Sequence, residues 1–342
     1  MTAAARNALR RRPVAAAARL ALIALLAAGL AGVTLAIVPA RASSGRSVGV
    51  VTPGGTLLRS DYGWDWKHVV QVVANLRAKP PKAPLVVLLG GSSARECTVL
   101  DPDWTAQLQR RARAKVIAHN LGSKHRTYSQ DLAFVKLLPR VPTIVYIGIN
   151  LGRFCLTVQP TTVHLPPPGP LHTYSQHVYT RSRIQSLAQK RAYVAQWMQV
   201  RYPNFLANYA AELRVLEELI QTCKARGLHV VLLDLPRDQQ AIGSSFNAPV
   251  GRFYAGCARL AKRYDIPWVH FVGRARLVTT DFYDIFHLVE PGRVKYQSLL
   301  SDTSVNLLRK YHMIGATPSP SPSPSISPSP SPSVSSSAPG SF

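Results

Sequence analysis

The fold is decided by residues 85–93, which read Leu-Val-Val-Leu-Leu-Gly-Gly-Ser-Ser. The apolar residues at the start show no polar alternation, which is typical of a strand buried on both faces of a parallel sheet. Gly90 and Gly91 predict a tight turn at the carboxyl end of that strand, because glycine accepts backbone conformations that other residues avoid. Ser92 then stands at the edge where open α/β sheets bind their ligands.

Further strands and helices alternate along the chain. Short apolar segments predict strands at 115–119, 143–147, 229–235 and 268–272. Helices are predicted between them, at 104–114, 128–138, 204–226 and 250–263. Such alternation is typical of a parallel sheet with helices on both faces. The sequence therefore predicts an α/β fold, a doubly wound, flavodoxin-like three-layer sandwich with a central parallel sheet of about five strands.

The N-terminal end has a different character. Residues 20–38 form an uncharged apolar run of 19 residues, and five arginines precede it. About 20 residues span a bilayer, and basic residues before the span favour a cytoplasmic N-terminus. We predict that 1–42 is an Arg-rich cytoplasmic end with either a transmembrane signal anchor or a signal peptide cleaved after Ala42. Either form would make the rest of the chain extracellular, anchored by a single pass or secreted; a buried core helix is the alternative.

The remaining boundaries follow from composition. Residues 43–84 are predicted to be a connector with an amphipathic helix at 66–76 and a proline-rich break at its end. The α/β domain is predicted at 85–314, with an insertion at about 156–202 that forms a rim or lid and contains a helix at 184–200. Residues 315–342 are rich in Pro and Ser, build no core and are predicted to be a disordered, extended tail.

The chain is strongly basic. It has 41 Lys and Arg against 16 Asp and Glu, a formal net charge of +25. Such a surface attracts anionic partners, whether anionic lipid, a polyanionic cell envelope or nucleic acid. Export and the lack of a recognised binding motif argue against nucleic acid. We therefore predict membrane contact through the N-terminal segment, and the sequence leaves the oligomeric state open.

Ser92 is a candidate nucleophile. A nucleophilic serine needs exposure, a base and hydrogen-bond donors for the oxyanion. The turn after a parallel strand supplies the exposure, and the following helix points free N–H groups toward it. The spacing of Ser93 and Glu96 is also that of a capping box, so the turn could equally be a plain helix start.

Other strand ends and a late motif supply possible partners. Asp284-Ile285-Phe286-His287 places a carboxylate beside an imidazole, which is the arrangement that orients a catalytic base. A surface ion pair is the alternative, and Asp281 is a rival carboxylate. Gly122 and Asn150 end the second and third strands, either as turn residues or as hydrogen-bond donors.

Together these residues follow the order and spacing of the SGNH (GDSL-like) hydrolase family, which the chain resembles over about residues 85–311. The resemblance implies that Ser92 is the nucleophile, His287 the base and Asp284 the residue that orients the base. It also implies an oxyanion hole made of the Ser92 and Gly122 N–H groups and the Asn150 amide.

The chain departs from the family pattern at three positions. Gly91 and Ser93 replace the Asp and Leu of the family's Gly-Asp-Ser-Leu motif, and Leu151 stands where many members carry Asp. These departures resemble a divergent, membrane-anchored branch that includes proteins modifying the acyl groups of envelope polymers. They bear on the substrate class more than on the catalytic residues.

The chain has four cysteines. In an oxidising compartment they would form two disulfides in one of three pairings, and buried free thiols are the alternative. The resemblance places Cys97 and Cys155 in neighbouring loops at strand ends, and Cys223 and Cys257 on helices that flank the fourth strand. It therefore favours the pairs Cys97–Cys155 and Cys223–Cys257.

Three basic residues follow the strand ends near Ser92. Lys124, Arg126 and Arg153 would bind an anionic substrate there or remain solvated charges. No His or Cys spacing is typical of a metal site, and we predict neither a metal nor an organic cofactor.

The resemblance implies an exported serine esterase that hydrolyses an ester (acyl) bond of a small molecule or a cell-envelope glycan. Two alternatives stay open. An O-acyltransferase modifying an envelope polysaccharide or polymer would use the same residues. A catalytically silent envelope-binding or scaffold protein would use only the basic surface.

Overall fold

The computed structural model describes residues 62–158, 161–171 and 183–315. The predicted membrane or signal segment at 1–42 and almost all of the predicted tail lie outside these residues. Within the described ranges, no helix has the length and apolar character needed to cross a membrane.

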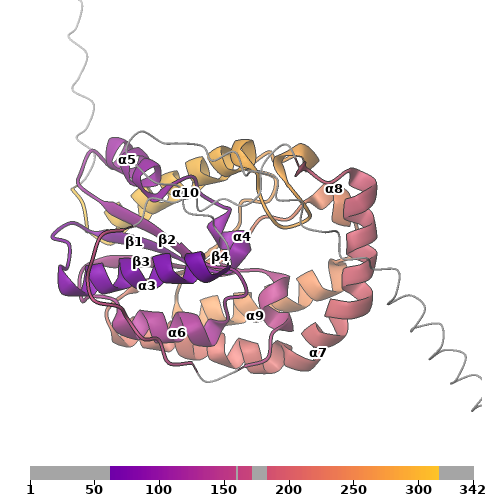
Figure 1. Ribbon diagram of the computed structural model, residues 1–342, viewed down its shortest axis with the longest axis horizontal. Coiled ribbons are helices and arrows are strands. Elements are labelled where there is room, and N and C mark those ends of the chain that lie inside the picture. Colours follow the sequence, from indigo (N-terminus) through magenta and orange to yellow (C-terminus); the bar gives the residue numbers. More distant parts are fainter. Residues whose placement is uncertain (1–61, 159–160, 172–182, 316–342) are drawn as a thin grey trace, which may run out of the picture. The chain divides into compact units, whose positions relative to one another are not determined.

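The centre of the fold is a five-stranded sheet in which all strands run parallel (Figure 1). Its order is β2-β1-β3-β4-β5. The chain therefore builds outward from β1 first on one side and then on the other, which confirms the predicted doubly wound α/β fold. The strands are β1 (Leu85–Gly90), β2 (Ile117–Gly122), β3 (Thr143–Ile149), β4 (His229–Asp234) and β5 (Trp268–Val269).

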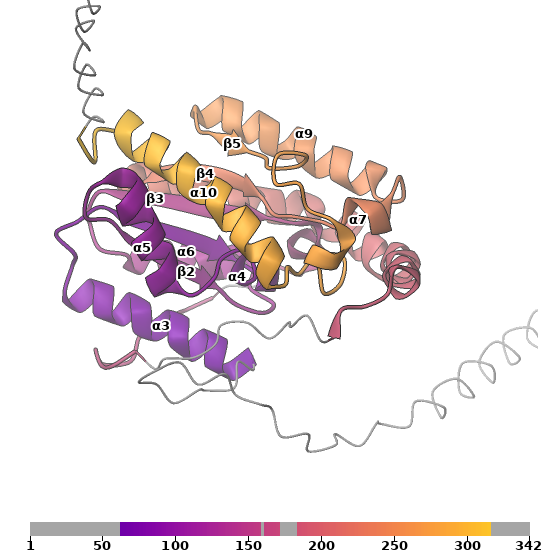
Figure 2. The same ribbon diagram turned by 90° about the horizontal axis from the view of Figure 1, so that it is seen from above.

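Helices cover both faces of this sheet, as Figure 2 shows. Successive side chains of a strand point to opposite faces. Val86 and Leu88 accordingly lie in the core beneath one helical layer, and Val87 and Leu89 in the core beneath the other. The first layer contains α5 (Asp101–Ala112) and α10 (Glu290–Lys310). The second contains α3 (Tyr62–Ala78), α6 (Tyr128–Leu137), α7 (Leu187–Ala225) and α9 (Asn247–Tyr264).

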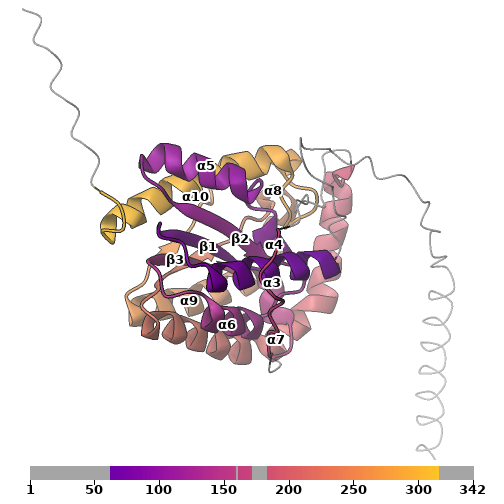
Figure 3. The ribbon, with the colours of Figure 1, turned by 60° about the vertical axis from the view of Figure 1, so that its left-hand side comes forward.

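Helix α3 changes the predicted boundary of the domain. Its residues Val69, Val73 and Leu76 are buried in the core beside α6 (Figure 3). The Trp66 ring also meets the Phe134 ring edge-on, with 5.2 Å between their centroids. Each buried apolar side chain contributes about 1.5–3 kcal/mol. The second half of the predicted connector at 43–84 is therefore part of the α/β fold.

The predicted insertion at 156–202 divides into two parts. Its proline-rich part is held against α3, where Asn75 Nδ2 donates to the Gly169 carbonyl at 2.7 Å. Its predicted helix joins the next predicted helix to form α7, which begins after a capping box of Ser186 and Gln189. Figure 1 shows that α7 changes direction partway along. Pro203 lies inside the helix and explains this, because proline lacks the N–H that the preceding turn requires.

All four cysteines are buried free thiols, so both predicted disulfides are wrong. Cys97 lies in the core beneath α5 and α10, and Cys155 lies in the core on the opposite face of the sheet. The sheet itself separates this pair. Cys223 and Cys257 share one core but pack there without a bond, as small apolar groups do.

We expect these thiols to resist alkylation in the native protein. Burial raises the pKa of Cys155 and of Cys223 to about 12, and it raises the pKa of Cys97 and Cys257 as well. Little of the reactive thiolate is then present near pH 8. Mass spectrometry after iodoacetamide treatment should find slow labelling in buffer and four labelled cysteines in guanidinium chloride without a reductant. A need for reductant would show that disulfides exist.

Candidate active site

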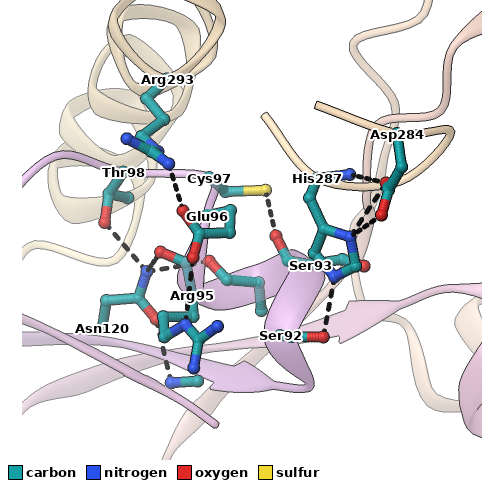
Figure 4. A network of polar contacts seen from close by, with 12 residues as sticks. Ser92, Ser93, Arg95, Glu96, Cys97, Thr98, Asn120, Asp284, His287 and Arg293 are labelled. Carbon is teal, nitrogen blue, oxygen red and sulfur yellow. Dashed lines mark hydrogen bonds and ion pairs between the residues drawn. The ribbon is translucent and has the colours of Figure 1, made fainter. Parts of the chain in front are cut away.

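Ser92 is placed by the end of β1. The strand finishes at Gly90, and Ser92 is the first residue of the short helix α4 (Ser92–Arg95). The helix cap predicted as an alternative does not form, because Gly91 is the N-cap and no side chain caps it. Glu96 instead lies fully buried between Arg95 and Arg293, which ties α4 to α10 (Figure 4).

His287 and Asp284 meet Ser92 from the other end of the chain (Figure 4). The distance from His287 Nε2 to Ser92 Oγ is 2.9 Å, and His287 Nδ1 lies 2.8 Å from Asp284 Oδ2. A carboxylate at Nδ1 holds the proton on that nitrogen and leaves Nε2 free to accept the serine proton. The three predicted side chains therefore form a continuous chain of hydrogen bonds.

Asp284 is held in its ionised form. Burial raises the pKa of this carboxyl group, but His287 and the N–H groups of Phe286 and His287 more than offset that effect, so the pKa lies below its ordinary value. The rival Asp281 accepts hydrogen bonds from Lys295 Nζ at 2.7 Å and from the Val278 N–H at 2.9 Å. It is therefore engaged elsewhere.

The predicted oxyanion donors differ in their positions. Asn150 lines the pocket at Ser92, and its Nδ2 donates to Ser93 Oγ at 2.9 Å, which leaves its second amide N–H for another acceptor. Gly122 is not among the described lining residues, and its N–H donates to Asn120 Oδ1 at 2.9 Å. A Cβ at Gly122 would stand 2.5 Å from the Arg95 backbone nitrogen. The structure thus uses this glycine for close packing of β2 against α4 rather than as an available donor.

Two of the predicted substrate-binding cations are held by a buried carboxylate. Asp131 Oδ1 lies 2.6 Å from Arg126 Nε, and Asp131 Oδ2 pairs with Arg153. Both guanidinium groups also donate to strand-end carbonyls, Arg126 to Leu121 at 2.7 Å and Arg153 to Gly148 at 2.8 Å. Arg126 and Arg153 line the pocket, but their role is to hold together the loops after β2 and β3.

A second buried carboxylate lies close to this cluster. Glu212, on α7, is fully buried, and neither of its oxygens has a hydrogen-bond donor among the described residues. Burial raises its pKa to about 7, with Arg153 opposing the rise. The folded chain therefore binds a proton that the unfolded chain releases at a lower pH.

We expect Glu212→Gln to stabilise the protein at alkaline pH. Because the pKa of Glu212 in the folded protein lies above its ordinary value of 4.5, the stability of the wild type should fall as pH rises through about 4.5 to 7. The variant should lack this decline and gain about 1–3 kcal/mol in the free energy of unfolding near pH 8. Urea unfolding across this range measures it. The exposed Glu218→Gln on the same helix is the control, and parallel curves for all three proteins would contradict the prediction.

The pocket above Ser92 has a volume of about 260 Å³. Its described lining includes several residues that the sequence did not single out for the site: His125, Tyr193, Trp197, Arg201 and Phe286. His125 has a left-handed backbone, with φ of 57°. The sequence does contain a pattern that indicates part of this pocket lining. Tyr193, Trp197 and Arg201 are spaced four residues apart and so share one face of a helix.

The described residues contain no group of three or more His, Cys, Asp or Glu side chains that could hold a metal ion.

Comparison with known proteins finds likeness in structure only. No protein-family model matches the chain, and no curated protein matches it. A lipase/acylhydrolase from Enterococcus faecalis is similar at 13% sequence identity, over 69% of this chain and 100% of that chain, with a TM-score of 0.39. A GDSL-like lipase from Bacteroides thetaiotaomicron is similar at 12% identity, over 70% and 98% of the two chains, with a TM-score of 0.38.

A mutant of an acetyl-xylooligosaccharide esterase from Geobacillus stearmophilus has 12% identity, over 68% of this chain and 97% of that chain, with a TM-score of 0.41. The fold is the doubly wound α/β fold predicted from the sequence, with a parallel sheet of order β2-β1-β3-β4-β5. At these identities and TM-scores the likeness says nothing of the reaction.

Proposed function

We propose that the chain is a serine esterase whose nucleophile is Ser92. The observation that supports it most is the chain of hydrogen bonds from Ser92 Oγ through His287 to Asp284, with distances of 2.9 and 2.8 Å. A serine at a sharp strand–helix turn, bonded to a histidine that a carboxylate orients, is the arrangement that activates a hydroxyl for acyl transfer.

The reaction follows from these contacts. His287 Nε2 takes the Ser92 proton as Oγ attacks the ester carbonyl, and the carbonyl oxygen becomes an oxyanion. The Ser92 N–H and the Asn150 amide donate to that oxyanion, and one such donor contributes about 10²–10³ in rate. His287 then returns the proton to the leaving alcohol. Water repeats the sequence on the acyl-enzyme and releases a carboxylic acid.

A labelling experiment tests this function. Purified full-length chain should react with a fluorophosphonate probe, peptide mapping should place the label on Ser92, and short-chain aryl esters should be hydrolysed. Added alcohol or sugar acceptors then decide between hydrolysis and transfer: an acceptor ester among the products would identify an O-acyltransferase. An unlabelled Ser92 together with inert esters would reject catalysis in favour of an envelope-binding scaffold.

We also propose that the enzyme works outside the cytoplasm, at or near a membrane. The support is the uncharged apolar run at 20–38 behind five arginines. An alkaline phosphatase fusion after residue 60 should be active in a bacterial host, because that reporter folds only after export. Deletion of residues 1–42 should abolish its activity, and an inactive full-length fusion would reject export.

A further inference from the structure

The pocket at Ser92 has an excess of positive charge. Among its described lining residues, Lys124, Arg126, Arg153 and Arg201 are basic, whereas Asp284 is the one acid and is bonded to His287. Asp131 neutralises one of the two buried guanidinium groups, and the nearby Glu212, whose pKa is about 7, offsets part of the second charge near neutral pH. A cavity with one sign of charge raises the local concentration of ligands of the opposite sign.

Lys124 and Arg201 differ from the buried pair because both are exposed. They come from separate elements, Lys124 from the loop after β2 and Arg201 from α7, and both line the same cavity. Both are close to one ring: burial lowers the pKa of His125, and Lys124 and Arg201 lower it further. Two exposed cations from different elements thus line the same pocket.

Arg201 also acts on the interior of the pocket. Burial raises the pKa of Cys155 to about 12, and Arg201 opposes that rise. Burial and then Asp284 raise the pKa of Tyr193, which Arg201 again opposes. Cys155 and Tyr193 both line the cavity at Ser92. Arg201 therefore acts electrostatically on groups that line the cavity at Ser92.

We propose that the ester carries an anionic oxygen group, a carboxylate or a phosphate, which binds between Lys124 and Arg201 while Ser92 attacks the acyl carbon. Arginine binds such a group through a planar fork of N–H donors, and lysine adds a mobile point charge. The two residues determine specificity. This inference rests on the proposed esterase function.

The test compares matched esters with and without an anion. Acetoxybenzoate and its methyl ester place the charge on the alcohol side, and 4-nitrophenyl hydrogen glutarate and its methyl ester place it on the acyl side. The quantity compared is the kcat/KM for the anionic ester divided by that for its neutral partner. This ratio should fall about tenfold in Lys124→Gln and in Arg201→Gln for at least one of the two pairs. Tenfold is the low end of what the loss of a charge-assisted hydrogen bond costs. An aryl acetate bearing a phosphate group then separates phosphate from carboxylate recognition.

Matched controls separate local charge from overall charge. Lys136→Gln and Arg214→Gln remove exposed cations from α6 and α7 that are not among the described lining residues, so the ratio should stay within about twofold of the wild-type value. The inference would be overturned if the wild type hydrolyses neutral esters and neither Lys124→Gln nor Arg201→Gln changes the ratio. The esterase function would then still stand.

A binding measurement keeps the test independent of turnover. In the full-length chain with isotope-labelled histidine, 4-hydroxybenzoate and inorganic phosphate should each be titrated while the His125 ring signals are followed by NMR, with His125→Gln for assignment. An anion between the two cations should raise the pKa of His125, and both variants should weaken this response. If no ester is turned over but the response is present, the esterase proposal fails and the anion site stands. The anion site would be overturned if neither anion changes the His125 ring signals or their pH dependence.

Discussion

Ser92→Ala is expected to lower kcat/KM for ester hydrolysis by about 10³–10⁶, the range that follows removal of a catalytic serine. The alanine methyl group removes the hydroxyl that lies 2.9 Å from Nε2 of His287, and the attacking oxygen is lost with it. The protein should keep its stability, because α4 is anchored by the buried Glu96 and not by Ser92.

Ser93→Ala is the matched control for this result. Ser93 Oγ accepts a hydrogen bond from Asn150 Nδ2, so its loss loosens an amide beside the reacting carbonyl without removing the nucleophile. A loss of about tenfold or less is expected, with fluorophosphonate labelling of Ser92 retained. The mechanism would be wrong if Ser92→Ala and the wild type hydrolyse esters at equal rates. It would also be wrong if the fluorophosphonate label is lost in Ser93→Ala and kept in Ser92→Ala.

Asp131→Asn is expected to lower the free energy of unfolding by about 3–5 kcal/mol, because it leaves two guanidinium groups without their shared carboxylate. Asp131 is fully buried, and so is its partner Arg126, whereas Arg153 is 2% exposed. Asparagine keeps the size of the side chain but not its charge, so the effect reports the electrostatics rather than a cavity. Urea unfolding followed by circular dichroism measures it.

An exposed ion pair provides the reference for that measurement. Asp302 lies 2.7 Å from Arg111, and its side chain is 58% exposed. Asp302→Asn should therefore cost less than about 1 kcal/mol. If the two variants lose similar stability, the cluster around Asp131 does not hold the loops after β2 and β3 as described.

The sequence was most informative where one physical requirement dominated. Residues 85–89 must be buried on both faces, and β1 lies where that requirement placed it. The fifth strand was overestimated, since a run of apolar residues at 268–272 does not show where pairing ends; only Trp268 and Val269 pair with β4. The sequence predicts two helices at 184–200 and 204–226, whereas the structure has one, α7, which tolerates Pro203 with a change of direction.

The residues of the site also differ in how far the sequence predicts them. Ser92, Asp284 and His287 could be predicted because the glycine turn before Ser92 and the Asp284–His287 motif follow each other in a distinctive order along the chain. The roles of Gly122, Arg126 and Arg153 depend on partners that are distant in sequence or on hydrogen bonds that a local pattern does not contain. A glycine at a strand end can serve either as a hydrogen-bond donor or as a site of close backbone packing. An arginine beside a pocket can bind either a ligand or a buried carboxylate such as Asp131.

The bend of α7 separates the part of the helix that lines the pocket from the part that packs along the sheet. The pocket residues Tyr193, Trp197 and Arg201 all precede Pro203, whereas Leu216 and Leu219, which pack in the core of the sheet, follow it. Trp197 lines the pocket and packs in the core at once, so the stretch before the proline is tied to the foundation of the domain. Arg201 is the exposed member of that face, and its exchange would alter the pocket wall while the core beneath the serine stays as it is.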